Sequence, residues 1–255
     1  MDVPLAADLS GQVALVTGAS SGLGARFARV LTAARARVVL TARRTERLEK
    51  LREEIESAGG SACALPLDVT DPQSVAGTVA RAEREFGPVT ILVNNAGMNV
   101  EGRAVDLAVG DYDRIMDTNV RGAFLMAREV ARSMIGRGEG GQIVNIASIG
   151  AQKVLPGLAA YCMSKAAVVM MTQALAREWA RHGINVNAIC PGYILTEINE
   201  HWFAGEGGEK QKKRFPRRRV GTPSDLDGAL LLLAAPQNRF MTGSVVTVDD
   251  GQSLG

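Results

Sequence analysis

The sequence has few of the residues that bind metals or form disulfide networks. Among its 255 residues are three cysteines, Cys63, Cys162 and Cys190, and two histidines, His182 and His201. The cysteines are odd in number and widely spaced, and none belongs to a CxxC or a Cys/His metal pattern. This scarcity argues against a disulfide framework and against a metal site, and it favours a cytoplasmic location.

Long apolar runs and a strong net charge are also lacking. No apolar stretch reaches the roughly 18 residues that a membrane span needs. Met1–Ser10 carries Asp2 and Asp8 and does not resemble a signal peptide. The net charge of +2 is too small to favour nucleic acid or a membrane as a partner. With 46% hydrophobic residues, the chain can bury one large core.

Strand-length apolar runs alternate with helix-length segments along the whole chain. Strands are predicted at Val13–Thr17, Val38–Thr41, Cys63–Leu67, Ile91–Val93, Gln142–Ile146, Ile184–Ile189 and Ser244–Val248. Helices are predicted at Gly22–Ala36, Glu46–Ala58, from Pro72 with Asp71 as N-cap, and at Asp111–Ile135, Tyr161–Arg181 and Asp225–Ala235. Continuously apolar strands are typical of a parallel sheet covered by helices on both faces. We therefore expect an α/β, Rossmann-type doubly wound fold in a single domain, 1–255.

One segment interrupts this alternation. Between Tyr193 and Arg219 the pattern becomes irregular, with charged residues and glycines at 205, 207 and 208. A long insertion in a compact fold is usually a functional lid, so we expect a substrate loop at about 193–219.

A glycine-rich segment, Thr17–Gly24, directly follows the first predicted strand and opens the first helix. Glycines let the backbone approach a pyrophosphate, and a helix N-terminus offers free N–H groups to it. The spacing Gly-x3-Gly-x-Gly differs from the common dinucleotide fingerprint, and a plain tight turn is the alternative interpretation. The cofactor-binding residues predicted here are Gly18, Ser20, Ser21, Gly22, Leu23 and Gly24.

The end of the second strand indicates which nicotinamide cofactor is used. Cofactors with a free ribose 2′-hydroxyl favour an acidic residue at that point, but Ala42 stands there, followed by Arg43 and Arg44. Arginine binds phosphate through a planar fork of donors. We therefore expect a 2′-phosphate clamp and NADP(H). The alternative is that both arginines are merely solvated.

Ser148, Tyr161 and Lys165 form the candidate reaction centre. Tyr161 and Lys165 are four residues apart and share a helix face, and Ser148 follows the preceding strand. A nearby cation favours the phenolate, so we expect Lys165 to lower the pKa of Tyr161 and suit it to acid–base work. A Tyr-x3-Lys pair alone is a weak signal, since such pairs also occur on helix surfaces.

Taken together, these motifs resemble the short-chain dehydrogenase/reductase family. The resemblance covers Gln12–Gly251 and is carried by Thr17–Gly24, Asp68-Val69, Asn94-Asn95-Ala96-Gly97, Asn119, Ser148, Tyr161-x3-Lys165 and Pro191-Gly192. It implies a catalytic tetrad of Asn119, Ser148, Tyr161 and Lys165, in which Asn119 would hold a water in a proton relay to Lys165. Asp250 stands where the family often has glycine.

The resemblance also implies cofactor contacts and an assembly. Asp68 and Val69 would contact the adenine, and Thr196 the carboxamide end of the nicotinamide. Asn95 would support the central strand or lie near the ribose. Other contacts would come from Ala96, Gly97, Tyr161, Lys165, Pro191 and Gly192. By analogy, the chain would form a homotetramer.

Substrate residues are expected in the segment after Ser148 and in the predicted substrate loop. The candidates are Ile149, Gln152, Val154, Leu155, Tyr193, Glu197, Ile198, Trp202 and Phe203. They are mostly apolar, which favours a hydrophobic ketone or alcohol as substrate, although each could instead be core or interface. The function expected is an NADP(H)-dependent alcohol dehydrogenase or carbonyl reductase.

Two other functions remain open at this point. Lys210–Arg219 holds seven basic residues in ten, either as a solvated face or as an attraction for an anionic carrier. The second case would suit a 3-oxoacyl thioester reductase acting on acyl carrier protein or coenzyme A substrates. A catalytically silent NADP-sensing protein is disfavoured, because no member of the expected tetrad is missing.

Overall fold

A computed structural model describes residues 7–197 and 199–254, and within them the chain forms one parallel sheet in the order β3-β2-β1-β4-β5-β6-β7. The strands are β1 Val13–Thr17, β2 Arg37–Ala42, β3 Ser61–Pro66, β4 Ile91–Asn94, β5 Gly141–Ile146, β6 Ile184–Pro191 and β7 Val245–Val248. Each expected strand is present, and all the pairings are parallel. The expectations for Met1–Ala6 and Ile198 lie outside the described residues.

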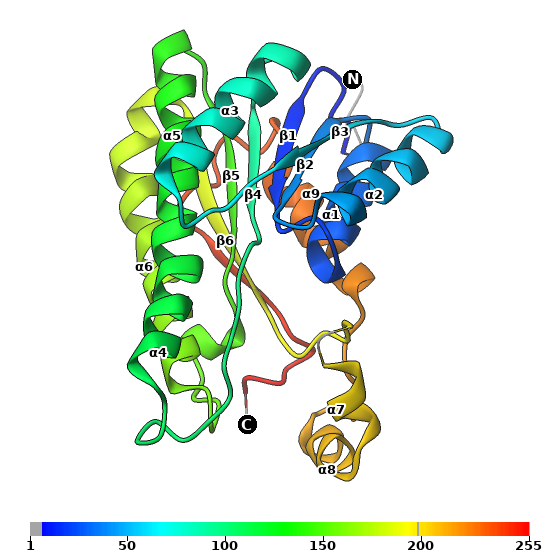
Figure 1. Ribbon diagram of the computed structural model, residues 1–255, viewed down its shortest axis with the longest axis vertical. Helices are drawn as coiled ribbons and strands as arrows, with labels where there is room; N and C mark the ends of the chain where they lie inside the picture. The colour runs from blue at the N-terminus through cyan, green and yellow to red at the C-terminus, as the bar shows by residue number, and fades with distance from the viewer. Residues whose placement is uncertain (1–6, 198, 255) are drawn as a thin grey trace.

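Helices cover both faces of the sheet (Figure 1). On one face lie α1 Gly22–Ala33, α2 Thr45–Ser57 and α9 Asp227–Ala234; on the other lie α3 Pro72–Phe86, α4 Val109–Met116, α5 Ala123–Arg137 and α6 Ala159–Trp179. Successive strand residues point to opposite faces, so Val38 and Leu40 pack under α1 and α2 while Val39 faces α3 and α5. The doubly wound fold is thus confirmed. Short helical turns, η2 Ile149–Ala151, η3 Ala180–His182 and η4 Pro223–Leu226, complete the element order.

The expected continuous helix Asp111–Ile135 is wrong in one respect. Between α4 and α5 the chain forms a π-helical turn, η1 Asp117–Gly122. Gly122 in this turn abuts Val69 so closely that an added Cβ would lie 2.7 Å from its side chain. Asn119, in the same turn, is 2% exposed. A single widened turn of this kind does not show in the apolar periodicity of the sequence. Such π-helical turns often occur at functional sites.

The segment at about 193–219, which was expected to be an irregular loop, is partly helical. It contains two short helices, α7 Glu200–Ala204 and α8 Glu206–Arg214, which project below the sheet in Figure 1. The glycines that suggested a loop allow these helices to pack tightly. A Cβ at Gly208 would lie 2.4 Å from the Cα of Phe203, a contact that only glycine permits.

The loops after β1 and β4 are joined where the strand order reverses. The hydroxyl of Thr17 accepts hydrogen bonds from the main-chain N–H groups of Asn95 (3.0 Å) and Ala96 (2.9 Å). The Asn95 side chain donates in return to the carbonyls of Thr17 (3.0 Å) and Gly18 (3.3 Å). In open α/β sheets, this reversal point opens the crevice in which ligands bind.

Replacing Thr17 with valine tests this junction. The change keeps the shape of the side chain but leaves two partly buried N–H groups without an acceptor, so we expect the free energy of unfolding in urea to fall by about 1–3 kcal/mol. Thr41→Val is the matched control, because its equally buried hydroxyl only donates, to the carbonyl of Val16. Equal losses in the two variants would contradict the role given to Thr17.

Candidate active site

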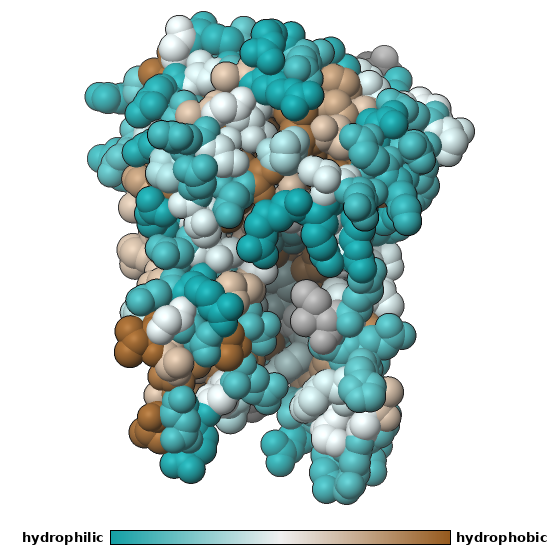
Figure 2. Space-filling model, viewed as in Figure 1, coloured by the Kyte–Doolittle hydropathy of each residue, from teal (hydrophilic) through white to brown (hydrophobic). Residues whose placement is uncertain are grey.

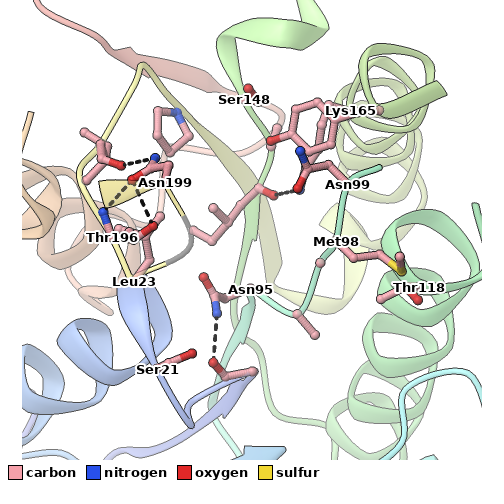
Figure 3. Close-up of a pocket in the computed structure, with 18 of the residues that line it drawn as sticks. Ser21, Leu23, Asn95, Met98, Asn99, Thr118, Ser148, Lys165, Thr196 and Asn199 are labelled. Atoms are coloured by element: carbon pink, nitrogen blue, oxygen red, sulfur yellow. Dashed lines mark hydrogen bonds between the residues drawn. The ribbon is translucent and has the colours of Figure 1, made fainter. Parts of the chain in front are cut away.

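A cavity of about 780 Å³ runs along the carboxyl edge of the sheet. It extends from the end of β2, past β1 and β4, to the start of α6 and to α7 and α8. Figure 2 shows the molecule hollowed between α7–α8 and the side that carries α4. In Figure 3, Ser148 and Lys165 lie on one side of this space, Thr196 and Asn199 on the other, and Ser21 and Leu23 at the start of α1.

The glycine-rich loop forms one end of the cavity. Gly18, Ser20, Ser21 and Leu23 line it. Gly18 adopts φ +67° and Gly22 adopts φ +53°, a left-handed backbone that favours glycine. Gly22 and Gly24 shape the loop without lining the cavity: a Cβ at Gly24 would lie 2.3 Å from the Gly18 carbonyl oxygen. The start of α1 is therefore packed directly against the loop.

Arg44 is fixed beside this loop. Its guanidinium donates hydrogen bonds to the hydroxyls of Ser20 (3.0 Å) and Ser21 (2.8 Å). Arg43 lines the same end, where its charge helps to lower the pKa of Asp68 after the larger effect of hydrogen bonds from Thr70. The two arginines that follow β2 thus lie with the phosphate loop at one end of the cavity.

The remaining expected cofactor residues also line the cavity. Those from the loops after β3, β4 and β6 are Asp68, Val69, Asn95, Ala96, Gly97, Pro191, Gly192 and Thr196. Thr196 reaches over the start of α1, where its methyl group would lie 3.6 Å from a Cβ at Gly22. Its main-chain N–H donates to Asn199 Oδ1 at 2.8 Å, so the segment after β6 is tied above the phosphate loop.

Ser148, Tyr161 and Lys165 come together on one wall of the cavity. The side chains of Ser148 and Tyr161 are hydrogen-bonded. Ser148 also accepts from the Gly150 N–H at 3.0 Å, which orients its hydroxyl. Lys165 Nζ donates to the carbonyl of Ile146 at 2.8 Å and lies 5.6 Å from the centre of the Tyr161 ring.

The electrostatics of this centre differ from the expectation. Burial raises the pKa of Tyr161, and the hydrogen bond from Ser148 offsets the rise only in part. Burial also lowers the pKa of Lys165 to about 8. The expected lowering of the Tyr161 pKa by Lys165 is therefore not found, because desolvation dominates and the lysine is turned to the Ile146 carbonyl.

Asn119 lies behind the centre, in the π turn. Its side chain clasps the main chain of Met98, accepting from the N–H and donating to the carbonyl, both at 2.8 Å. It also donates to Ser164 Oγ at 2.9 Å, and Ser164 donates to the Tyr161 carbonyl. Both amide hydrogens of Asn119 are thus engaged with protein groups. Ser164, which directly precedes Lys165 and belongs to none of the motifs in the sequence, links Asn119 to the Tyr161 helix.

Five of the expected substrate residues line the cavity, namely Ile149, Leu155, Tyr193, Trp202 and Phe203. Three others do not. Val154 is 83% exposed, Glu197 forms an ion pair with Arg47, and Gln152 accepts from the Thr247 hydroxyl at 3.3 Å. In the segments after β5 and β6, residue order alone did not reveal which side chains turn inward.

The cavity wall also contains polar residues that the sequence analysis missed. They are Asn99, Glu101, Thr118, Asn199, Gln211 and Arg214. Gln211 and Arg214 are three apart on α8 and therefore share a face, a relation hidden as long as this segment was taken as irregular. The substrate end is consequently less apolar than expected.

Most of the basic stretch Lys210–Arg219 is neutralised locally. Lys210 pairs with Glu206, Lys212 with Glu209, and Arg217 and Arg219 with Asp250. Asp250 adopts φ +56°, so the aspartate keeps the left-handed backbone of a glycine while adding a carboxylate. These pairs weaken the case for a carrier-attracting surface.

Within 7–197 and 199–254, no helix combines the length and apolarity that a membrane crossing demands. The same residues contain no group of three or more His, Cys, Asp or Glu side chains placed to hold a metal ion.

Fold and site together define a Rossmann-type oxidoreductase, and comparison with known proteins specifies the family. Residues 18–253 match the family model described as enoyl-(acyl carrier protein) reductase. Gluconate 5-dehydrogenase of Gluconobacter oxydans (strain 621H) is 40% identical over 95% of both chains. The NAD-dependent glycerol dehydrogenase of Listeria innocua is 38% identical over 97% of this chain and 96% of its own. The chain belongs to the short-chain dehydrogenase/reductase family.

Solved structures agree with this assignment. A gluconate 5-dehydrogenase from Burkholderia cenocepacia J2315, in complex with NADP and tartrate, superposes with a TM-score of 0.93 at 34% identity. The match covers 97% of each chain. A short-chain type dehydrogenase/reductase from Mycobacterium marinum has the same TM-score at 38% identity, over 97% of this chain and 98% of its own.

The buried Lys165 predicts how stability depends on pH. Its pKa of about 8 in the folded chain lies below the ordinary 10.5, so the buried ammonium opposes folding by about 3 kcal/mol below pH 8. This penalty fades as the pH rises from 8 to 10.5, because the folded chain then releases the proton first. We expect Lys165→Met to raise the urea midpoint of the cofactor-free protein at pH 7, with a gain that shrinks towards pH 10.5. A pH-independent difference between the two proteins would contradict the assigned shift.

Proposed function

We propose that the protein is an NADP(H)-dependent oxidoreductase that interconverts a carbonyl group and a secondary alcohol. The observation that carries the proposal is the meeting of Ser148, Tyr161 and Lys165 in the cavity that also contains the glycine-rich loop and Arg44. The same cavity thus contains the loop that would bind the phosphates of a dinucleotide and the proton-transfer groups that would face its nicotinamide end.

The chain's own groups would handle the oxygen of the substrate. A bound nicotinamide would supply or take up the hydride at the carbonyl carbon. In reduction Tyr161 would donate its phenolic proton to the carbonyl oxygen, and in oxidation the phenolate would take a proton from the alcohol. Ser148, which is hydrogen-bonded to Tyr161 and oriented by the Gly150 N–H, would hold the substrate oxygen next to that phenol. Lys165, whose ammonium is buried beside the tyrosine, would stabilise the charge left on the phenolate.

Asn119 would act by positioning the groups around it. Its clasp on Met98 and its bond to Ser164 brace the loop after β4 against the Tyr161 helix. A Cβ at Gly97 would lie 3.3 Å from Asn119 Oδ1 and 3.5 Å from Lys165 Nζ, so the lack of a side chain there keeps the space between them open.

Cofactor choice rests on the end of β2. Ala42 offers no carboxylate to a ribose hydroxyl, whereas Arg43 and Arg44 line the cavity beside the phosphate loop. The Burkholderia structure contains NADP, which supports the same choice, while the Listeria relative is named as NAD-dependent. We therefore propose NADP(H) on the strength of the two arginines.

The substrate we propose is polar, in place of the hydrophobic ketone expected from the sequence. Asn99, Glu101, Gln211 and Arg214 add hydrogen-bonding and charged groups to the cavity. The names of the relatives, gluconate 5-dehydrogenase and glycerol dehydrogenase, support hydroxylated substrates. A 3-oxoacyl thioester is the second candidate, because the description of the matching family model names an acyl carrier protein. Assay with thioester substrates distinguishes the two.

We also propose that the chain self-associates, as a cytoplasmic homotetramer. Phe124 on α5 and Met163 and Met170 on α6 are exposed, with Met170 at 64%. Large apolar side chains along two neighbouring helices suit an interface between copies.

Tyr161→Phe tests the reaction. Removing the phenolic proton should lower kcat by at least about a thousand-fold in NADP(H)-linked turnover, because the step loses its acid and base. NADPH binding, measured by fluorescence titration, should stay within about three-fold of the unchanged protein. Turnover at the original rate would refute the role assigned to Tyr161.

Arg44→Ala tests the cofactor choice. Loss of a charge-assisted contact with the 2′-phosphate should raise KM for NADPH by about 10- to 100-fold and leave KM for NADH nearly unchanged. Arg47→Ala is the matched control, since Arg47 is paired with Glu197 and lies outside the cavity wall. A native preference for NADH, or equal effects of the two variants, would count against the clamp.

A further inference from the structure

Arg214 differs from the other basic residues around it. Of the seven in Lys210–Arg219, it is the one that lines the cavity. Lys210, Lys212, Arg217 and Arg219 are engaged by carboxylates outside the cavity. Within the part of the chain that the structure describes, no ion pair is recorded for Arg214. Its charge is therefore available to whatever occupies the cavity.

Packing of the neighbouring side chain fixes the end of α8, and with it Arg214, against the rest of the cavity wall. Its neighbour Phe215 is 5% exposed and packs on the ring of Tyr193, with 5.4 Å between ring centres. Tyr193 also packs edge-on against Phe203 and lies near enough to Tyr161 to affect its pKa. Phe215 and the half-buried Tyr193 thus tie the end of α8 to the segment after β6, which lines the same cavity as Tyr161.

The other groups at this end of the cavity suit hydroxyls. Gln211 lies one turn before Arg214 on the same helix face, and Asn99 and Glu101 belong to the loop after β4. Glu101 also helps to raise the pKa of Tyr193, after burial and Cys162, so its negative charge lies close to the same ring. An anionic group would be repelled from Glu101 and attracted to Arg214, whereas hydroxyls could donate to Glu101.

We propose that Arg214 binds the carboxylate of a polyhydroxy acid whose reacting carbon lies at Ser148 and Tyr161. The inference rests on the proposed function and narrows its substrate to anionic sugar acids in preference to neutral polyols. Arginine suits this task because its planar guanidinium can bind both oxygens of a carboxylate.

Gluconate and sorbitol provide a matched pair of probes. Both are six-carbon polyols, and they differ at one end, where gluconate has a carboxylate and sorbitol a hydroxymethyl group. Initial rates of NADP+ reduction would be measured with each for the unchanged protein, for Arg214→Gln and for Lys213→Gln. Lys213 is an exposed cation on the same helix that does not line the cavity, so it controls for the loss of surface charge.

The unchanged protein should favour gluconate. Arg214→Gln should lower kcat/KM for gluconate by about 10- to 100-fold, the value of a charge-assisted hydrogen bond, and change that for sorbitol by less than about three-fold. Lys213→Gln should change neither. Gluconate should also raise the Tm of the NADP+-loaded protein, and this rise should be lost in Arg214→Gln.

Several results would overturn the inference. They are a preference for sorbitol, equal losses on both substrates in Arg214→Gln, or an effect of Lys213→Gln as large as that of Arg214→Gln. If only uncharged ketones are reduced with NADPH, the proposed function stands and the carboxylate site falls. If no ketone, polyol or sugar acid is turned over although NADPH binds, the proposed function falls as well.

Discussion

The Thr17 hydroxyl joins the two loops between which the crevice opens. In the sheet, the strand order proceeds outward from β1 on one side and from β4 on the other, and this reversal leaves a gap at the carboxyl ends of the two strands. The loops that border the gap have no neighbouring strand to pair with there. Thr17 satisfies two N–H groups of the second loop, and the Asn95 amide satisfies carbonyls of the first. The backbone of both loops is thereby fixed without filling the gap, which leaves space for a ligand against rigid walls.

A second constraint is the burial of charge. Lys165 is 6% exposed, and this burial lowers its pKa to about 8 and opposes folding at neutral pH, although its ammonium donates a hydrogen bond to the Ile146 carbonyl. A leucine or methionine at this position would fold at lower cost. Sites that act on charge often sacrifice stability in this way. The apolar clusters on both faces of the sheet offset that cost.

The strands and the pairing of Tyr161 with Lys165 were predictable because their signals are local. Val13–Thr17 was found from five successive apolar or β-favouring residues, and Tyr161 with Lys165 from the four-residue spacing of a helix. The π turn at Asn119 and the inward face of α8 depend on contacts with Met98, Val69 and Phe203, which are distant in sequence. The pKa of Tyr161 was misjudged for a similar reason: spacing indicated a nearby cation but not how deeply both groups are buried.

The cavity wall includes Arg44 at the β2 end, Arg214 at the α8 end, and the proposed proton-transfer groups Ser148 and Tyr161. At the β2 end, Arg44 is oriented by the Ser20 and Ser21 hydroxyls; at the α8 end, the anchored Phe215 places Arg214. Charges at separate ends fix a ligand along an axis, whereas a single cluster would leave it free to pivot. Hydride transfer requires the donor and acceptor carbons to meet in one orientation. A cofactor phosphate held at one end and a substrate carboxylate at the other would therefore restrict the position of both reactants, and Ser148 and Tyr161 lie where the two would meet.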